Sequence, residues 1–450
     1  MKIARPLIAL LMTAAGALAE APGEDRVLAY VRAYNSGSAE QFEEFAQANY
    51  TPEALQRRSA EERRGMFEQI RAAHGKLEIG AIRVEGNNLH VNMKADRGET
   101  LRFRFMIEPQ PPHRIAGLGI DIGGGDDEGP QLPPLNLPKT DFSAALDAYI
   151  RRLPDFSGSV LVARNGEVQF EKAYGMASRR YAVANRPSTR FNVGSITKDF
   201  TKVAIGQLAQ AGRLNLDATI ATYLPDYPNK DVAQKITVQQ LVDHRSGLGD
   251  IFTPRYWERN AAHFRTLQSY IDFFASDALL FEPGKGQRYS NYGYVVLGAI
   301  IEAVSGESYF DYVRKNVFGP AGMTGSGFFD PQRIVPDVAI GHTRHGPNGP
   351  LDEWVESAAL RGPLPAGGSV STARDLLHFD RALRAGKLLS AERTRWFFRG
   401  DPEAPWVGAG GFPGVNAVIA SDREWTVVVL TNIDPPTGER FGEALLEALR

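Results

Sequence analysis

The spacing of apolar residues changes along the chain and divides it into two regions. Residues 25–48 and 52–73 carry apolar side chains three or four positions apart, a period typical of amphipathic helices. From Lys76 the period shortens toward two, which predicts strands. The predicted strands span 77–84, 89–95, 100–107 and 114–120. Residues 24–122 are therefore predicted to form a small α+β domain.

Helices followed by a meander of strands resemble a cystatin or NTF2-type unit. The histidines of this domain, His74, His90 and His113, are isolated in sequence, and no grouping of reactive side chains is evident. Residues 123–140 are rich in Gly, acidic residues and Pro, and they lack periodicity. They are predicted to be a linker, with an acidic metal site as the alternative.

Residues 141–450 are predicted to form a larger α/β domain. Its expected strands are 158–163, 168–174, 414–419 and 425–431, and its terminal helices are 142–153 and 438–449. Asn165-Gly166 between the first two strands is a strong hairpin signal. We expect one antiparallel sheet that carries both terminal helices on one face. The long stretch from Ser195 to about Phe379, which reads as helices and loops, is predicted to be a helical subdomain.

The composition is that of an ordinary globular protein. The chain has 450 residues, of which 43% are hydrophobic and 23% charged, and its formal net charge is −2. Such a balance does not favour binding to nucleic acid or to an anionic membrane surface. The absence of cysteine excludes disulfides, thiol nucleophiles and cysteine-ligated metals.

The first residues predict export. Lys2 and Arg5 precede an almost wholly apolar stretch, residues 6–19, which ends in Ala17-Leu18-Ala19. This pattern is typical of a signal peptide, here residues 1–19 with cleavage after Ala19, and an uncleaved interfacial anchor is the alternative. No later stretch reaches the roughly 18 apolar residues of a membrane span. The mature chain is therefore expected to be periplasmic or secreted, without an integral membrane segment.

The candidate chemistry begins with Ser195 and Lys198. Residues 195–211 are predicted to form a helix that Gly212 ends, and three-residue spacing stacks the hydroxyl and the amine on one helix face. A base within reach of a hydroxyl is the requirement for a serine nucleophile. Ser-x-x-Lys alone is weak evidence, because a chain of this length contains such a match by chance.

Further stretches in a definite order strengthen the case. Asp243-His244-Arg245-Ser246-Gly247 follows the reactive helix, then comes Tyr289-Ser290-Asn291, and then Gly408-Ala409-Gly410-Gly411. Ser-x-x-Lys, Tyr-x-Asn and a Gly-rich edge strand in this order resemble the serine β-lactamase-like superfamily. That superfamily includes class C β-lactamases, D-alanyl-D-alanine carboxypeptidases, D-aminopeptidases and related esterases. The resemblance covers about residues 141–450.

The resemblance implies a role for each residue. Ser195 would attack an acyl carbon and form an acyl-enzyme, with Lys198 or Tyr289 as the base; the two would be strongly coupled, and the sequence does not choose between them. Asn291 would donate to Lys198 or to the acyl-side amide of the substrate. The backbone N–H groups of Ser195 and Gly411 would form the oxyanion hole.

One departure bears on the substrate. Relatives usually carry Lys or His where this chain has Gly408, and that cation binds a substrate carboxylate. Its absence weakens the case for penicillins and D-Ala-D-Ala peptides and favours esters or amides without a carboxylate. Two alternatives stay open: a D,D-carboxypeptidase or β-lactamase that acts on peptidoglycan-like substrates, and a catalytically inactive binding or regulatory module.

The remaining expectations are more general. His244 is expected to hold a loop in place, and a metal site at His342 and His345 is the weaker interpretation of that pair. We expect a small-molecule or peptide ester or amide as substrate, no cofactor, no metal and no nucleic acid. The N-terminal domain would shield the cleft or bind an unknown partner.

Overall fold

The computed structural model describes most of the chain. The described residues are 22–56, 59–85, 87–96, 100–121, 132–138, 141–329, 334–344, 351–353 and 362–450. The chain divides into two compact units, residues 1–127 and 128–450, and each is described here by itself. The predicted signal peptide and much of the predicted linker lie outside the described residues.

The first unit consists of helices and one antiparallel meander in the order β1-β2-β3-β4. Its elements are α1 (Glu24–Ser36), α2 (Ala39–Asn49), α3 (Pro52–Gln56), α4 (Ala60–His74), β1 (Leu77–Glu85), β2 (Asn88–Ala95), β3 (Thr100–Ile107) and β4 (Ile115–Asp121). Tyr30 and Phe105 lie at the centre of its core, with ring centroids 5.3 Å apart. The strands agree with the predicted ones, but residues 25–48 form two helices. Gly37 ends α1 in the left-handed region, with a φ of 79°. The Ser38 side chain then caps the N-terminus of α2.

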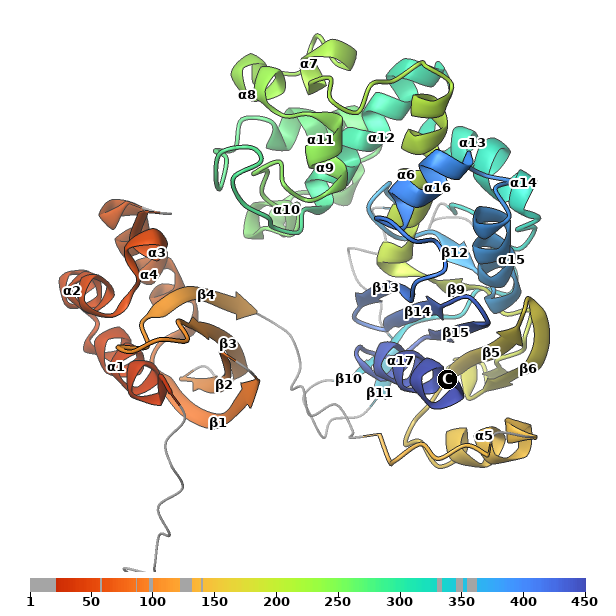
Figure 1. The fold of residues 1–450 in the computed structure, drawn as a ribbon, viewed down its shortest axis with the longest axis horizontal. Coiled ribbons are helices and arrows are strands. Elements are labelled where there is room, and N and C mark those ends of the chain that lie inside the picture. The colour runs from red at the N-terminus through yellow and green to blue at the C-terminus, as the bar shows by residue number, and fades with distance from the viewer. Residues whose placement is uncertain are drawn as a thin grey trace, which may run out of the picture. The chain divides into compact units, whose positions relative to one another are not determined.

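The second unit is built on a five-stranded antiparallel sheet of order β13-β14-β15-β5-β6 (Figure 1). Its strands are β5 (Gly158–Arg164), β6 (Glu167–Tyr174), β13 (Trp406–Phe412), β14 (Val415–Ser421) and β15 (Trp425–Thr431). As predicted, the first and last strands share the sheet, because β5 pairs with β15. Asn165 and Gly166 turn the β5–β6 hairpin with φ values of 50° and 77°. Gly414, which was predicted to begin a strand, instead turns the chain between β13 and β14 with a φ of 69°.

The two faces of the sheet are covered by different helices. Alternate residues of its central strands, among them Val160 and Val427, pack against α5 (Phe142–Ile150) and α17 (Thr437–Leu449), as predicted. Residues 132–138 lie on the same core through Leu132, Leu135 and Leu137. Pro133 O accepts a hydrogen bond of 2.7 Å from the Tyr149 hydroxyl. This stretch of the predicted linker therefore belongs to the packed second unit, because its leucines have an apolar surface to cover.

The other face of the sheet packs against α6 (Thr197–Gln210) and α15 (Ala373–Arg384), beyond which lie the other helices of the unit (Figure 1). Those helices are α7 (Ile220–Tyr223), α8 (Lys230–Lys235), α9 (Val238–Val242), α10 (Pro254–Glu258), α11 (Leu267–Phe274), α12 (Asn291–Ser305), α13 (Tyr309–Val313), α14 (Gly319–Ala321) and α16 (Ala391–Phe397). The unit also contains short helical segments and small strands. The short helical segments are η1 (Gly194–Ile196), η2 (Ala261–His263) and η3 (Arg314–Phe318). The small strands are β7 (Met176–Ser178), β8 (Val183–Ala184), β9 (Phe191–Asn192), β10 (His342–Arg344), β11 (Leu351–Glu353) and β12 (Val370–Ser371). Within the described residues, no helix combines the length and the apolar character needed to cross a bilayer.

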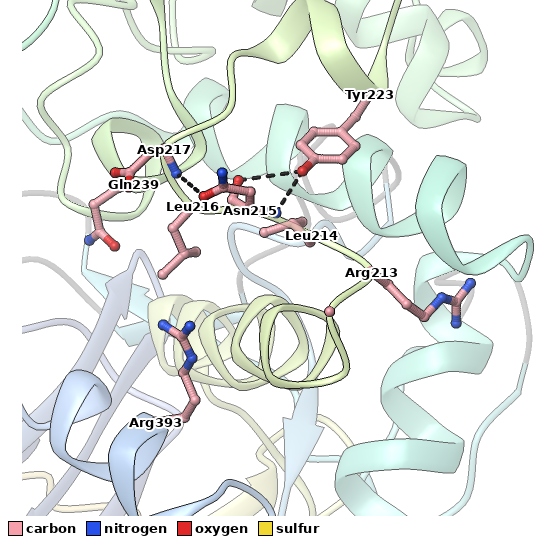
Figure 2. A pocket seen from close by; sticks show the side chains of 9 residues that line it. Arg213, Leu214, Asn215, Leu216, Asp217, Tyr223, Gln239 and Arg393 are labelled. Carbon is pink, nitrogen blue, oxygen red and sulfur yellow. Dashed lines mark hydrogen bonds between the residues drawn. The ribbon is translucent and has the colours of Figure 1, made fainter.

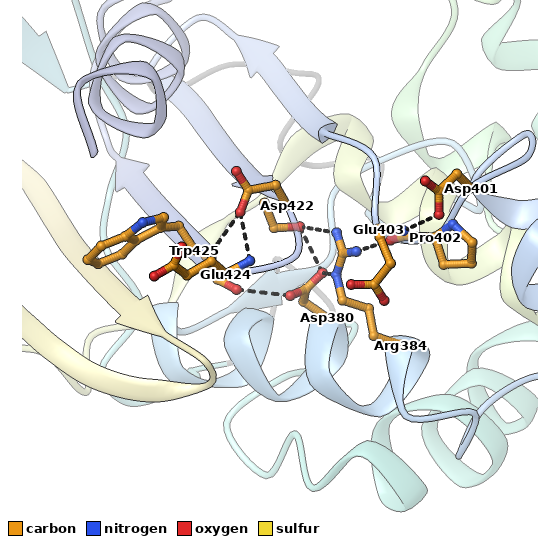
Figure 3. Close-up of polar contacts among 10 residues, drawn as sticks. Asp380, Arg384, Asp401, Pro402, Glu403, Asp422, Glu424 and Trp425 are labelled. Carbon is orange, nitrogen blue, oxygen red and sulfur yellow. Dashed lines mark hydrogen bonds and ion pairs between the residues drawn. The ribbon is translucent and has the colours of Figure 1, made fainter. Parts of the chain in front are cut away.

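A buried ion pair within α15 is hydrogen-bonded to the sheet (Figure 3). Asp380 accepts from Arg384 Nε at 2.9 Å, from Ser421 Oγ at 2.9 Å and from Thr426 Oγ1 at 3.0 Å. The side chains of Asp380 and Arg384 are 2% and 14% exposed. Hydrogen bonds inside the protein satisfy the Asp380 carboxylate. If this carboxylate were removed, the buried guanidinium of Arg384 would lose its counter-charge.

We predict that Asp380→Ala lowers the free energy of unfolding by about 3–5 kcal/mol, the usual cost of breaking a buried pair. Urea unfolding followed by tryptophan fluorescence measures this, because all 5 tryptophans lie in residues 128–450. Arg314→Ala is the control: it breaks an exposed pair with Asp311 and should cost less than about 1 kcal/mol. Equal effects of the two variants would contradict the prediction.

Candidate active site

A strained turn presents Ser195 at the start of α6. Ser195 lies in η1, directly after Gly194, whose φ is 51°. Asn192 Oδ1 accepts from the Gly194 N–H at 2.8 Å and holds this turn. A Cβ on residue 194 would also lie 3.1 Å from the backbone of Gly410 and Gly411, so glycine meets both the conformational and the packing requirement. The hydroxyl therefore lies at a helix N-terminus, where developing negative charge is stabilised.

Lys198 is one turn further along and has three polar neighbours. Its Nζ is 3.1 Å from Ser195 Oγ and 2.7 Å from Asn291 Oδ1, and it also donates to Ala366 O. The residue is 5% exposed. Two of these neighbours are carbonyl-type oxygens, which only accept hydrogen bonds. A neutral amine that donates its two protons to them keeps its lone pair for the Ser195 hydroxyl. The geometry thus suits an amine that takes a proton from Ser195.

The pKa values of Lys198 and Tyr289 are shifted in opposite directions, which distinguishes the two candidate bases. Burial lowers the pKa of Lys198 to about 7, against the opposing effect of Asp250 and Asp199. Although Tyr289 is 48% exposed, desolvation on its protein-facing side raises its pKa to about 12, so its hydroxyl stays protonated. That hydroxyl donates to Ser195 Oγ at 2.7 Å. Near neutral pH the arrangement therefore favours Lys198 as proton acceptor and Tyr289 as hydrogen-bond donor.

Asn291 is oriented by a residue that sequence reasoning missed. Both oxygens of Asp250 lie 3.1 Å from Asn291 Nδ2, and Asp250 Oδ2 also accepts from the Asn291 backbone N–H at 3.2 Å. Because the carboxylate takes the amide nitrogen, Oδ1 of Asn291 faces Lys198 and accepts from it. The expectation that Asn291 donates to Lys198 is therefore wrong. The only sequence signal for Asp250 is its place shortly after the stretch that contains His244.

His244 contacts the tyrosines rather than the nucleophile. Its ring stacks on Tyr289 with centroids 4.5 Å apart, and its Nδ1 accepts from the Ser290 N–H at 3.2 Å. Burial lowers the pKa of His244 to about 4, so the ring is neutral. These contacts fit the expected loop-holding role. His342, the described member of the His342–His345 pair, is buried, and both of its ring nitrogens contact protein atoms; His345 lies outside the described residues.

The edge strand β13 brings Gly411 beside Ser195. A turn at Pro413-Gly414 joins Phe412 to its partner Val415, and the next pair is Gly411 with Asn416. Since hydrogen-bonded and open pairs alternate along an antiparallel ladder, the N–H of Gly411 points away from β14, off the free edge of the sheet. A Cβ on Gly410 would lie 2.2 Å from Val193 O and 2.6 Å from the Ser195 nitrogen. Glycine there lets the strand and η1 touch through their backbones.

Comparisons with known proteins identify the family of the second unit. The family model described as Beta-lactamase matches residues 146–450. The chain belongs to the Beta-lactamase family. It is 34% identical over 258 residues to PbpX of Bacillus subtilis (strain 168), a candidate penicillin-binding protein, with 57% of this chain and 62% of that protein covered. The chain thus spans less than two thirds of that relative.

Solved structures show the same fold. A penicillin-binding protein from Bacillus halodurans is similar at 27% identity with a TM-score of 0.59, covering 66% of this chain and 97% of that one. A D-amino acid amidase from Ochrobactrum anthropi SV3, complexed with L-phenylalanine amide, is similar at 25% identity with a TM-score of 0.57, covering 68% and 97%.

The position where family members usually carry a cation is occupied differently here. A Cβ on Gly408 would lie 2.8 Å from Asp199 Oδ2 and 3.1 Å from the Trp406 ring. Those two side chains therefore fill the space that a side chain at residue 408 would enter. Burial raises the pKa of Asp199 to about 7. The Asp199 carboxyl group thus lies beside Gly408, the position at which the resemblance implies a cation.

A separate depression of about 490 Å³ lies at the C-terminal end of α6 (Figure 2). Its lining includes Asn215, Tyr223 and Arg393 but none of Ser195, Lys198 and Tyr289. Asn215 and Tyr223 hydrogen-bond to one another there, as Figure 2 shows. This depression is therefore not the candidate active site.

We predict that kcat/KM for an uncharged ester rises with pH and levels off above an apparent pKa near 7, because the charged form of Lys198 has no lone pair. The negative charge of Asp250 favours the charged amine, so Asp250→Asn should move this rise to lower pH, by about one unit. A pH profile of initial rates measures both effects. Asp311→Asn, which removes an exposed carboxylate, is the control and should leave the profile in place. A shift to higher pH in Asp250→Asn would refute the prediction.

Proposed function

We propose that the protein is a serine hydrolase that cleaves an ester or amide bond through an acyl-enzyme on Ser195. The observation that carries the proposal is the position of Lys198 Nζ, which lies 3.1 Å from Ser195 Oγ and is held by Asn291 Oδ1 and Ala366 O. Family membership and the similarity to penicillin-binding proteins and an amidase support it. An inactive binding module is the less favoured candidate, because it would have no use for a buried lysine beside a serine.

The proposed reaction follows from the positions of the protons. Lys198 takes the hydroxyl proton as Ser195 Oγ bonds to the acyl carbon, and the N–H groups of Ser195 and Gly411 stabilise the oxyanion. Tyr289 gives its proton to the leaving alcohol or amine and regains one from the Lys198 ammonium. In the second half, water attacks the acyl carbon, its proton passes back through the same groups, and Ser195 leaves as the alcohol.

The surroundings of the site favour an acyl group that is apolar and uncharged. Phe412 directly follows Gly411, and its ring centroid is 5.7 Å from that of Phe252, which is 45% exposed. Phe252 lies two residues after Asp250 and stacks on Trp257 at 5.5 Å. Because Asp250 holds Asn291, this aromatic wall belongs to the acyl side of the site. With no cation at Gly408, a penicillin or a D-Ala-D-Ala peptide is the less favoured substrate.

Localisation and the N-terminal unit enter the proposal as well. We infer that the enzyme works in the periplasm or outside the cell, in line with the signal-peptide pattern of residues 1–19. The unit of residues 1–127 would bind a partner or shield the cleft.

Turnover of p-nitrophenyl acetate tests the nucleophile. Ser195→Ala should lower kcat/KM by at least about three orders of magnitude, because no other described side chain takes its place. A fluorophosphonate label followed by mass spectrometry should add to Ser195 in the native protein and not in the variant. Ser143→Ala, a surface serine of α5, is the matched control. A folded native protein with neither turnover nor label at Ser195 would favour the inactive module.

The aromatic wall generates a second prediction. Phe252→Ala should lower kcat/KM for p-nitrophenyl phenylacetate about fivefold relative to p-nitrophenyl acetate, which shares the leaving group, since an aromatic contact contributes roughly 1 kcal/mol. Rates for the two esters in both proteins give this ratio. If both esters slowed equally, Phe252 would support the fold rather than select the acyl group.

A further inference from the structure

A second depression of about 630 Å³ lies behind the catalytic segments, and nothing in the proposed reaction uses it. Lys202 of α6, one turn beyond Lys198, forms one wall. Asp243 and Arg245, the two neighbours of His244, form another. Gln287, two residues before Tyr289, adds a third, and α16 with the residues after it closes the site. Its volume lies in the range of sites that hold small molecules.

The charges that line this pocket are unbalanced. Its lining contains four cationic residues, Lys202, Arg245, Arg395 and Arg399, and one carboxylate, Asp243, a formal surplus of three positive charges. Arg399 lies 3.5 Å from Asp243. The other three cations form no ion pair with any described residue. Burial lowers the pKa of Lys202, which favours its neutral form. The three arginines stay charged at any physiological pH, so they supply the positive charge of the pocket.

Asp243 and Gln239 already use their side-chain acceptor oxygens, whereas donors of the lining remain. Asp243 Oδ2 accepts from Gln239 Nε2 at 2.6 Å, and Gln239 Oε1 accepts from Trp396 Nε1 at 2.8 Å. The backbone oxygen of Asp243 accepts from Gln287 Nε2 at 3.3 Å. By contrast, the guanidinium of Arg395 has no hydrogen-bond partner among the described residues, and Arg245 uses one of its nitrogens on Gly284 O. A ligand that fits must therefore bring acceptors and negative charge.

We propose that this pocket binds a phosphate group, either free or on a small phosphorylated molecule. Guanidinium groups bind phosphate oxygens through paired, charge-assisted hydrogen bonds. A phosphate monoester carries about −1.5 to −2 at neutral pH, which matches the two positive charges that Arg245, Arg395 and Arg399 leave in excess of Asp243 better than a single carboxylate does. The volume leaves room for an organic part beside the half-buried ring of Trp396.

Isothermal titration calorimetry with the full chain tests the proposal. Inorganic phosphate and glucose 6-phosphate are titrated at constant ionic strength, balanced with NaCl so that screening is equal. We expect saturable binding of at least one of them to the native protein. The double variant Arg395→Gln/Arg399→Gln should weaken it at least about tenfold, because two charge-assisted contacts are lost.

Arg393→Gln is the matched control, since Arg393 belongs to the same helix and lines the neighbouring depression (Figure 2). It removes one arginine charge from the same helix and should leave the affinity unchanged. Tighter binding of the sugar phosphate than of phosphate would identify a phosphorylated molecule as the ligand, and equal affinities would identify the free ion. The proposal is wrong if neither probe binds saturably, or if the Arg393→Gln variant loses as much affinity as the double variant. Hydrolysis of p-nitrophenyl acetate by each variant verifies its fold, and because that activity depends on Ser195, failure of the binding test leaves the proposed hydrolase intact.

Discussion

The burial of one amine is the constraint on which the site depends. Lys198 can act as a base near neutral pH only if its surroundings disfavour the ammonium form. Burial achieves this, and the two oxygens that accept from Nζ direct the remaining lone pair to Ser195. Asp250 opposes the effect by its charge but holds Asn291 in the orientation that the amine requires. The balance of these two influences of Asp250 sets the working pH of the site.

The second constraint is the close approach of two backbones. The turn before α6 and the edge strand β13 meet at Gly194 and Gly410, where a Cβ would collide with main-chain atoms. This contact brings the backbone of Gly411 beside η1, and we propose that the N–H groups of Ser195 and Gly411 form the oxyanion hole. The role of the sheet is thus to deliver a free edge beside the nucleophile, and the apolar packing of α5 and α17 on its opposite face keeps that edge in place.

The distribution of charge separates this chain from the pattern that its family suggests. A carboxyl group, Asp199, stands beside Gly408 where relatives usually have a cation. The positive charge lies instead in the pocket behind His244 and Lys202, on the other side of the catalytic segments. The ring centroids of Phe252 and Phe412 lie 5.7 Å apart, and we propose that these rings contact the acyl group of the substrate. Together these features point to an uncharged apolar substrate and to a separate place for an anion.

The sequence by itself determined what local rules govern. The apolar pattern located four of the five strands of the large sheet, whereas β13 was expected only from the family resemblance, as a Gly-rich edge strand. Asn165-Gly166 marked a hairpin, and Gly212 marked the end of α6. Ser-x-x-Lys spacing placed the amine beside the hydroxyl, because three residues make about one turn of helix. Boundaries were less accurate where the tertiary structure decides them: residues 132–138 pack on the second unit because its apolar core is there to receive leucines.

Only the tertiary structure decided which distant residues complete the site. Asp250 reaches Asn291 across 41 positions, and Ala366 O reaches Lys198 across 168. No local pattern encodes either contact, because each depends on how helices pack against the sheet. The choice of Lys198 over Tyr289 as proton acceptor likewise required the folded chain, since burial, which shifts the two pKa values in opposite directions, is a property of the packed structure.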